Sequence, residues 1–256
     1  HPGCSTLPQR VAHDGTGVLD LNTLLDRRRE QQATWVGLKR RVLDKLARLT
    51  RRGVRRHLYG GFLLRSAMME RSLDELAEEV GDGGESTSPS TSTFLTLHLN
   101  SYYFNMCGSL DNLSWALIYQ FRLLKEADEN RWEHQQFAAL HKKPLLSSLE
   151  NSGKHGLAVL IRDFQDWCLD LRTLRDPRAL RIPLNIPPVF FDETNPEGRG
   201  RSEGGLKNSA EGLRPWIMRE SPGIEILDPP RRISGDQDQW LALAGVVVNG
   251  ILTEMG

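Results

Sequence analysis

Cysteine is scarce in this sequence, and a long apolar run is missing. The 256 residues include three cysteines, Cys4, Cys107 and Cys168, an odd number at wide spacing. This usage indicates reduced core thiols rather than a disulfide framework, and it favours a cytoplasmic protein. The longest apolar run, Trp240–Leu252, includes Asn249 and has about half the length that a membrane-spanning helix needs. We therefore expect a core helix there and no membrane contact.

The sequence also lacks an excess of charge of one sign. Its 33 basic residues balance 33 acidic ones, so the overall charge does not indicate a nucleic-acid-binding protein. The distribution is uneven, because nine lysines and arginines lie between Lys39 and His57, with Asp44 as the only acid. Acids dominate from Asp74 to Glu85.

The basic stretch at 39–57 has two interpretations. Such a surface suits a phosphate backbone, and the candidate RNA contacts are then Arg51, Arg52, Arg55 and Arg56. More often, such a stretch is the solvated face of an amphipathic helix, here balanced by the acids from Asp74 to Glu85.

Signatures of several enzyme classes are absent. The chain has no phosphate-binding glycine loop, no nucleophile elbow and no paired zinc knuckle. His134 and His141 are seven residues apart, which would place them on one helix face, but no carboxylate or cysteine lies at a matching spacing. The pattern favours surface histidines, and we expect neither a metal site nor a cofactor.

Runs of alternating apolar and polar residues, which would indicate strands, are missing as well. Apolar residues instead recur at steps of three and four, the spacing of one helix face. The strongest pattern, from Thr93 to Ala127, predicts a central helix. We expect an all-α fold: a helical bundle with an irregular loop and a C-terminal helix. The predicted parts are a flexible lead-in at 1–17, the bundle at 18–190, and an exposed loop with the C-terminal helix at 191–256.

Three further segments carry more specific predictions. Residues Arg131–Leu149 form an amphipathic segment in which Pro144 marks a bend or break. A single helix is expected from Gly156 to Asp176, followed by a proline-rich exit, with Arg175 at the edge of its buried stripe. Short extended pieces are expected between Trp216 and Ile233, before a last helix at 239–255.

Two motifs in this chain resemble a known family. They are LNSYYFNMCGSLDNLSWAL at Leu99–Leu117 and LRTLRDPRALRIPLNIPP at Leu171–Pro188, with LHKKPLLSSL at Leu140–Leu149 between them. Together they cover somewhat under half of the chain. In this order they resemble a group of bacterial helical proteins that look like members of the HEPN superfamily.

The resemblance implies a helical bundle that forms a homodimer. Many HEPN proteins are metal-independent ribonucleases in toxin–antitoxin and antiphage systems. Their motif is an arginine, a spacer of four to six residues that starts with a polar one, and a histidine. The histidine moves a proton at the ribose hydroxyl or the leaving oxygen, while the arginine stabilises charge on the phosphate. Implied partners are RNA and an antitoxin or nucleotidyltransferase.

This chain matches the family motif only in part. Arg175 falls on the family's arginine and Asp176 on the polar residue after it, but Leu180 occupies the histidine position. Leucine cannot transfer a proton, and no histidine follows His155. The resemblance therefore implies an RNA- or nucleotide-associated or regulatory protein of a defence or stress module, with a degraded ribonuclease motif and without efficient catalysis.

Other interpretations stay open at this point. Arg175 paired with Asp111 inside the bundle would be a structural ion pair. The whole chain would then be a helical protein–protein interaction domain with no role in nucleic-acid binding. An active nuclease that uses other residues is a third alternative. Arg52 and His57 also have four residues between them, but they are expected inside a regular helix, so we interpret that match as coincidence.

Overall fold

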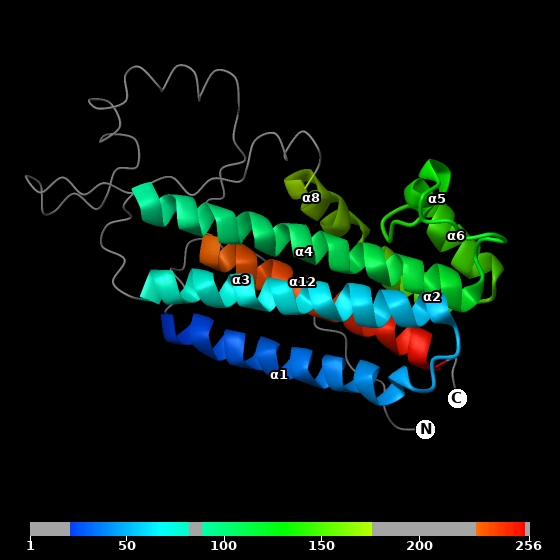
Figure 1. The fold of residues 1–256 in the computed structure, drawn as a ribbon, viewed down its shortest axis with the longest axis horizontal. Coiled ribbons are helices and arrows are strands. Elements are labelled where there is room, and N and C mark those ends of the chain that lie inside the picture. The colour runs from blue at the N-terminus through cyan, green and yellow to red at the C-terminus, as the bar shows by residue number, and fades with distance from the viewer. Residues whose placement is uncertain (1–20, 82–88, 176–228, 254–256) are drawn as a thin grey trace, which may run out of the picture.

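The computed structural model describes residues 21–81, 89–175 and 229–253, and within these ranges all regular structure is helical. The all-α prediction is therefore confirmed. Four long helices lie along the long axis of the molecule (Figure 1): α1 (Leu21–Leu46), α3 (Leu64–Gly81), α4 (Pro89–Phe121) and α12 (Pro229–Thr253). The shorter elements are α2 (Arg52–Arg55), the π-helix η1 (Arg56–Leu63), α5 (Trp132–Phe137), α6 (Lys143–Asn151), α7 (His155–Arg162) and α8 (Gln165–Arg175). None of the described helices is both long and apolar enough to cross a membrane.

Helix α4 is the centre of the bundle, as its apolar pattern predicts. It packs against α2, η1, α3, α8 and α12. Its buried stripe includes Leu99, Tyr102, Tyr103, Met106, Leu110, Leu113 and Leu117. The helix ends earlier than expected, at Phe121 rather than Ala127. Arg122 has a positive φ of 52°, a left-handed conformation that ends a helix.

An aromatic cluster joins three elements that are distant in the chain. Trp35 of α1 and Phe62 of η1 have ring centroids 5.8 Å apart, and Trp240 of α12 lies 5.4 Å from Trp35 and 5.8 Å from Phe62. All three side chains are fully buried. Helix α12 therefore contributes to the same core as α1 and η1.

Helix α12 begins much earlier than the sequence pattern predicts. The expectation of extended structure is wrong for residues 229–233, because α12 starts at Pro229. Proline is compatible with a first helical turn, where its missing N–H has no partner to lose. Hydrogen bonds then hold the first half of α12 against α4 and α8. Asp236 accepts them from the Tyr103 hydroxyl and from Trp167 Nε1, each at 2.9 Å.

The single helix expected from Gly156 to Asp176 is divided into α7 and α8. The break lies at Asp163 and Phe164, where the Phe164 amide donates to the Ile161 carbonyl at 3.1 Å and tightens the turn. The prediction is wrong because the apolar stripe has two different partners. Helix α7 packs against α6 and α12, whereas α8 packs against α4.

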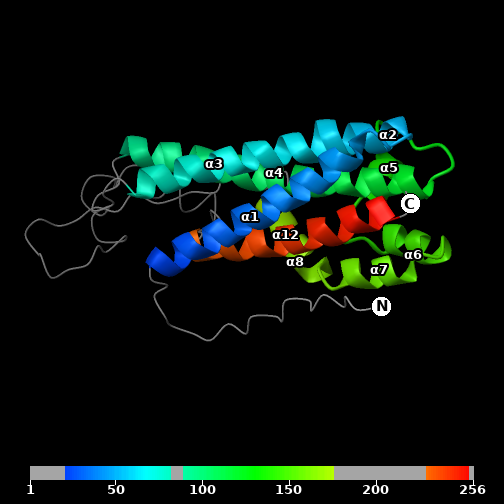
Figure 2. The ribbon, with the colours of Figure 1, turned by 90° about the horizontal axis from the view of Figure 1, so that it is seen from below.

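Helix α7 packs against α12 and α6 packs against α7, and both lie on the opposite side of the molecule from α3 (Figure 2). The break predicted at Pro144 is confirmed, since α5 ends at Phe137 and Pro144 stands in the first turn of α6. His134 lies in α5, and His141 lies in the turn before α6. The shared helix face expected for these two histidines is therefore wrong.

Candidate functional site

A π-helix brings a histidine against the centre of α4. Helix α2 continues directly into η1, where the backbone takes the wider π-helical turn. Two glycines permit the close approach: a Cβ on Gly53 would lie 2.5 Å from the Tyr119 ring, and one on Gly61 would overlap the Asn112 side chain. The glycines and the π-turn thus bury His57, which is 5 % exposed.

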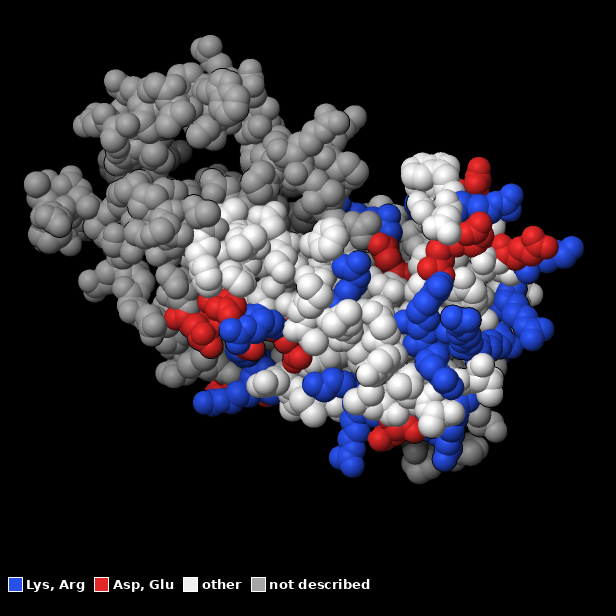
Figure 3. Space-filling view, viewed as in Figure 1, with Lys and Arg blue, Asp and Glu red and all other residues white. Residues whose placement is uncertain are grey.

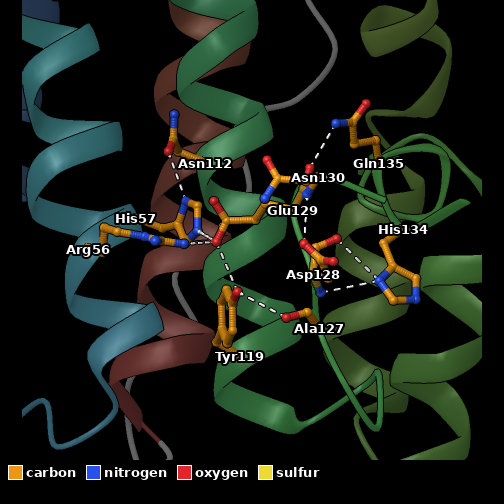
Figure 4. A network of polar contacts seen from close by, with 10 residues as sticks. All are labelled: Arg56, His57, Asn112, Tyr119, Ala127, Asp128, Glu129, Asn130, His134 and Gln135. Carbon is orange, nitrogen blue, oxygen red and sulfur yellow. Dashed lines mark hydrogen bonds and ion pairs between the residues drawn. The ribbon is translucent and has the colours of Figure 1, made fainter. Parts of the chain in front are cut away.

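Both ring nitrogens of His57 have oxygen neighbours (Figure 4). Nδ1 lies 3.0 Å from Asn112 Oδ1, and Nε2 lies 3.0 Å from Glu129 Oε1. Glu129 Oε1 also accepts a hydrogen bond from the Tyr119 hydroxyl at 2.9 Å and forms an ion pair with Arg56. One carboxylate oxygen thus joins η1, α4 and the segment that follows α4.

The environment of His57 favours its neutral form. Burial lowers the pKa of this histidine, the hydrogen bond to Asn112 opposes that change, and the charge of Arg56 adds to it. A neutral imidazole has one N–H and can donate to only one of its two oxygen neighbours at a time. Each ring nitrogen faces a protein oxygen and the ring is buried, so a substrate has no open approach to His57 for proton transfer.

The structure separates Arg52 from His57. Arg52 is exposed at the start of α2, while His57 is buried in η1. The regular helix expected around them is wrong, because the π-helix begins at Arg56. Arg52 therefore lies at the surface while the His57 ring faces Asn112 and Glu129.

A second polar cluster lies between α4 and α8. Arg172 Nη2 donates to Asp111 Oδ1 at 2.8 Å. The two residues border a small cavity that is also lined by Cys107, Ser114, Leu140, His141 and Cys168, with Leu110 and Leu171. Burial lowers the pKa of His141 to about 4, with smaller contributions in the same direction from Arg172 and Lys142.

Cys168, one of the two cysteines on this cavity, is poorly suited to nucleophilic chemistry. Burial raises the pKa of Cys168 to about 12, although the charge of Arg172 opposes the change. A thiol with such a pKa stays protonated at neutral pH and is a weak nucleophile. Within the part of the chain that the structure describes, no group of three or more His, Cys, Asp or Glu side chains is placed to bind a metal ion.

The predicted motif lies at the edge of the described chain. Arg175 is the last residue of α8, and its side chain lies outside the described residues, as do Asp176 and Leu180. Pairing of Arg175 with Asp111 therefore stays a prediction. The structure places Arg172, one turn earlier in α8, against Asp111.

The four candidate RNA-contact arginines have different surroundings. Arg51 Nη1 donates to the Tyr119 carbonyl at 2.8 Å and also to the Gln120 carbonyl, so it caps the last turn of α4. Arg55 Nη2 donates to the Leu49 carbonyl at 2.8 Å, and Arg56 forms its ion pair with Glu129. Arg52, Arg55 and Arg56 are nevertheless exposed, and blue side chains gather at this end of the molecule in Figure 3.

Asp111 was predicted from the sequence, whereas Glu129 and Tyr119 were not, and His57 was considered only for its spacing from Arg52. The signals were weak: a Gly60-Gly61 pair inside an amphipathic segment, and a polar side chain, Asn112, beside the apolar seam of α4. Contacts between residues 57, 112 and 129 depend on tertiary packing, which local periodicity does not report.

Comparisons with known proteins identify no relative of this chain. No protein-family model, no curated protein and no solved structure matches it.

Proposed function

We propose that this chain is a HEPN-like, RNA-associated protein without an efficient nuclease site. The observation that supports it is the exposure of basic side chains around the turn from α1 to α2. Arg41, Arg48, Arg52 and Arg55 are exposed there, and Asp44 is the only acid between Lys39 and His57. Guanidinium groups presented in this way suit the phosphates of a nucleic-acid backbone.

Inefficient catalysis follows from the chemistry of two positions. Leu180 stands where the resemblance requires a histidine, and leucine holds no transferable proton. The buried His57 does not replace it, since both of its nitrogens face protein oxygens inside the bundle. The role proposed is therefore binding or regulation in a defence or stress module, with an antitoxin or nucleotidyltransferase as partner.

Fluorescence anisotropy with a short labelled RNA tests the proposal. We expect binding that weakens steeply as salt is raised, because phosphate contacts release counterions. Arg41→Glu and Arg48→Glu should each weaken binding and each reduce the slope of log affinity against log salt by about 1. Arg29→Glu is the matched control, since Arg29 is an exposed cation in the first half of α1.

Wild-type protein that binds no RNA at low salt would contradict RNA association. An equal loss of affinity in Arg29→Glu and Arg48→Glu would contradict the proposed surface, since it would indicate an effect of net charge.

A helical interaction domain is the second candidate function. It is favoured by exposed apolar side chains on η1, α3 and α4, among them Leu64 at 57 % and Leu97 at 64 % exposure. Apolar groups gathered on one face of a helical protein are typical of a docking surface.

A further inference from the structure

A tryptophan lies exposed in α5, the short helix that follows α4 in the chain. Trp132 has 65 % of its surface exposed, whereas Trp35 and Trp240 are buried in the aromatic cluster of the core. Among the residues that the structure describes, no large apolar side chain is more exposed. A single exposed apolar side chain is ordinary on a protein surface, so the surroundings of Trp132 decide what it binds.

Hydrogen bonds hold the backbone on both sides of Trp132 (Figure 4). The Asp128 amide donates to His134 Nδ1 at 3.2 Å, and Gln135 Nε2 donates to the Glu129 carbonyl at 2.7 Å. These bonds connect the residues before Trp132 to those after it. The indole is therefore presented from a fixed backbone, so that little conformational freedom is lost when a ligand contacts it.

The same segment is anchored beside the basic surface of α2. Glu129 forms an ion pair with Arg56, whose side chain stays 59 % exposed. Trp132 follows Glu129 by three residues, so the two backbones lie within about 11 Å of each other. Arg52, one turn before Arg56, is exposed as well. Helices α5 and α2 accordingly lie at the same end of the bundle (Figures 1 and 2).

Acidic side chains also stand on this segment. The exposed charged residues near Trp132 are of both signs: Lys125, Glu126, Asp128, Arg131 and Glu133. This near balance gives α5 itself little attraction for a phosphate backbone, in contrast to the arginines of α2. An RNA bound at this end of the bundle would therefore keep its phosphates on the α2 side and turn a base toward Trp132.

We infer that Trp132 stacks on an unpaired base, so that the RNA bound is single-stranded or carries a single-stranded loop. The inference rests on the proposed RNA association and adds the class of RNA to it. Bases in a duplex are stacked on one another, whereas an unpaired base has a free face for an aromatic side chain. Because every base has such a face, we expect little preference for sequence.

Fluorescence anisotropy of the full chain with two labelled RNAs tests the inference. One RNA is a single strand of about ten nucleotides, and the other is the same strand annealed to its complement. Trp132→Ala should weaken binding of the single strand by about five- to a hundredfold and leave binding of the duplex unchanged. Trp132→Phe, which keeps an aromatic face, should retain most of the affinity.

Phe104→Ala is the matched control. Phe104 is an aromatic side chain that is 47 % exposed, and it lies roughly 25 Å along α4 from the end of that helix at Phe121. This variant should bind both RNAs like the wild type. Circular dichroism checks that each variant keeps its helical content.

The salt dependence separates stacking from charge. Trp132→Ala should lower the affinity for the single strand without changing the slope of log affinity against log salt, whereas Arg48→Glu should reduce that slope by about 1. Three results would overturn the inference and leave RNA association standing: unchanged single-strand affinity in Trp132→Ala, an equal loss for single strand and duplex, or an equal loss in Trp132→Phe. The first of them would leave a protein as the ligand of the exposed indole. Wild-type protein that binds neither RNA would overturn both proposals.

Discussion

The Arg172 guanidinium on α8 lies 2.8 Å from the Asp111 carboxylate on α4, and this pair links two segments that the family resemblance rests on. The side chains are 35 % and 30 % exposed, so solvent screens their attraction. The same arginine contributes to the low pKa of His141, which lies on the same small cavity. The pair therefore organises the contact between α4 and α8.

Removal of this ion pair should destabilise the fold modestly. We expect Arg172→Met to lower the free energy of unfolding by about 0.5–1 kcal/mol, the range for a partly exposed pair. Urea denaturation of Arg172→Met, Asp111→Ala and the double variant would isolate the coupling between the two residues. Additive losses would show that the pair contributes nothing of its own. Arg162→Met, which removes the more exposed pair with Glu150, is the control and should cost less.

The close approach of η1 to α4 predicts different stabilities for alanine substitutions at two adjacent glycines, Gly60 and Gly61. Gly61→Ala should destabilise the protein by about 1–3 kcal/mol, because its Cβ would overlap the Asn112 side chain. Gly60 is the matched control, since a Cβ there meets nothing within 4 Å. Gly60→Ala should be neutral or stabilising by up to about 1 kcal/mol, as alanine loses less backbone entropy. Equal unfolding free energies for the two variants would contradict the close approach of η1 to α4.

Acid should weaken the fold through two histidines. Burial lowers the pKa of both His57 and His141, to about 4 for His141. As the pH falls below 6.5, these histidines therefore become protonated in the unfolded chain before they do in the folded protein. The stability from burying neutral rings is therefore present at pH 7, decreases as the pH falls below 6.5, and for His141 stops decreasing below about pH 4. Thermal melts across this range should show a smaller pH dependence for His141→Asn than for the wild type. His155→Gln, at an exposed position, should melt like the wild type at each pH.

The position of Leu180 predicts the outcome of a nuclease assay. Purified wild-type protein should leave tRNA and mRNA intact, because no proton donor occupies the motif. Leu180→His should introduce cleavage, and Leu180→Asn, which adds polarity without a comparable titrating group, should not. Robust cleavage by the wild type that disappears in Arg175→Ala would contradict the proposal of a degraded site.

The helices and their buried faces were largely predictable from the sequence. The stripe of α4 and the break at Pro144 depend on residues within a few positions of one another, which periodicity and proline chemistry report directly. The division of α7 from α8 was not predictable in this way. No glycine or proline marks Asp163 and Phe164, and the break arises because the two halves pack against different helices.

By itself, the sequence determined an all-α protein with a central apolar helix and a basic stretch beside an acidic one. Only the tertiary structure decided that His57 is buried against Asn112 and Glu129 and that Arg51 caps α4. The physical reason is the range of the interactions. Helix formation and amphipathicity are local along the chain, whereas His57 meets partners 55 and 72 positions away, which only the packing of the whole bundle brings together.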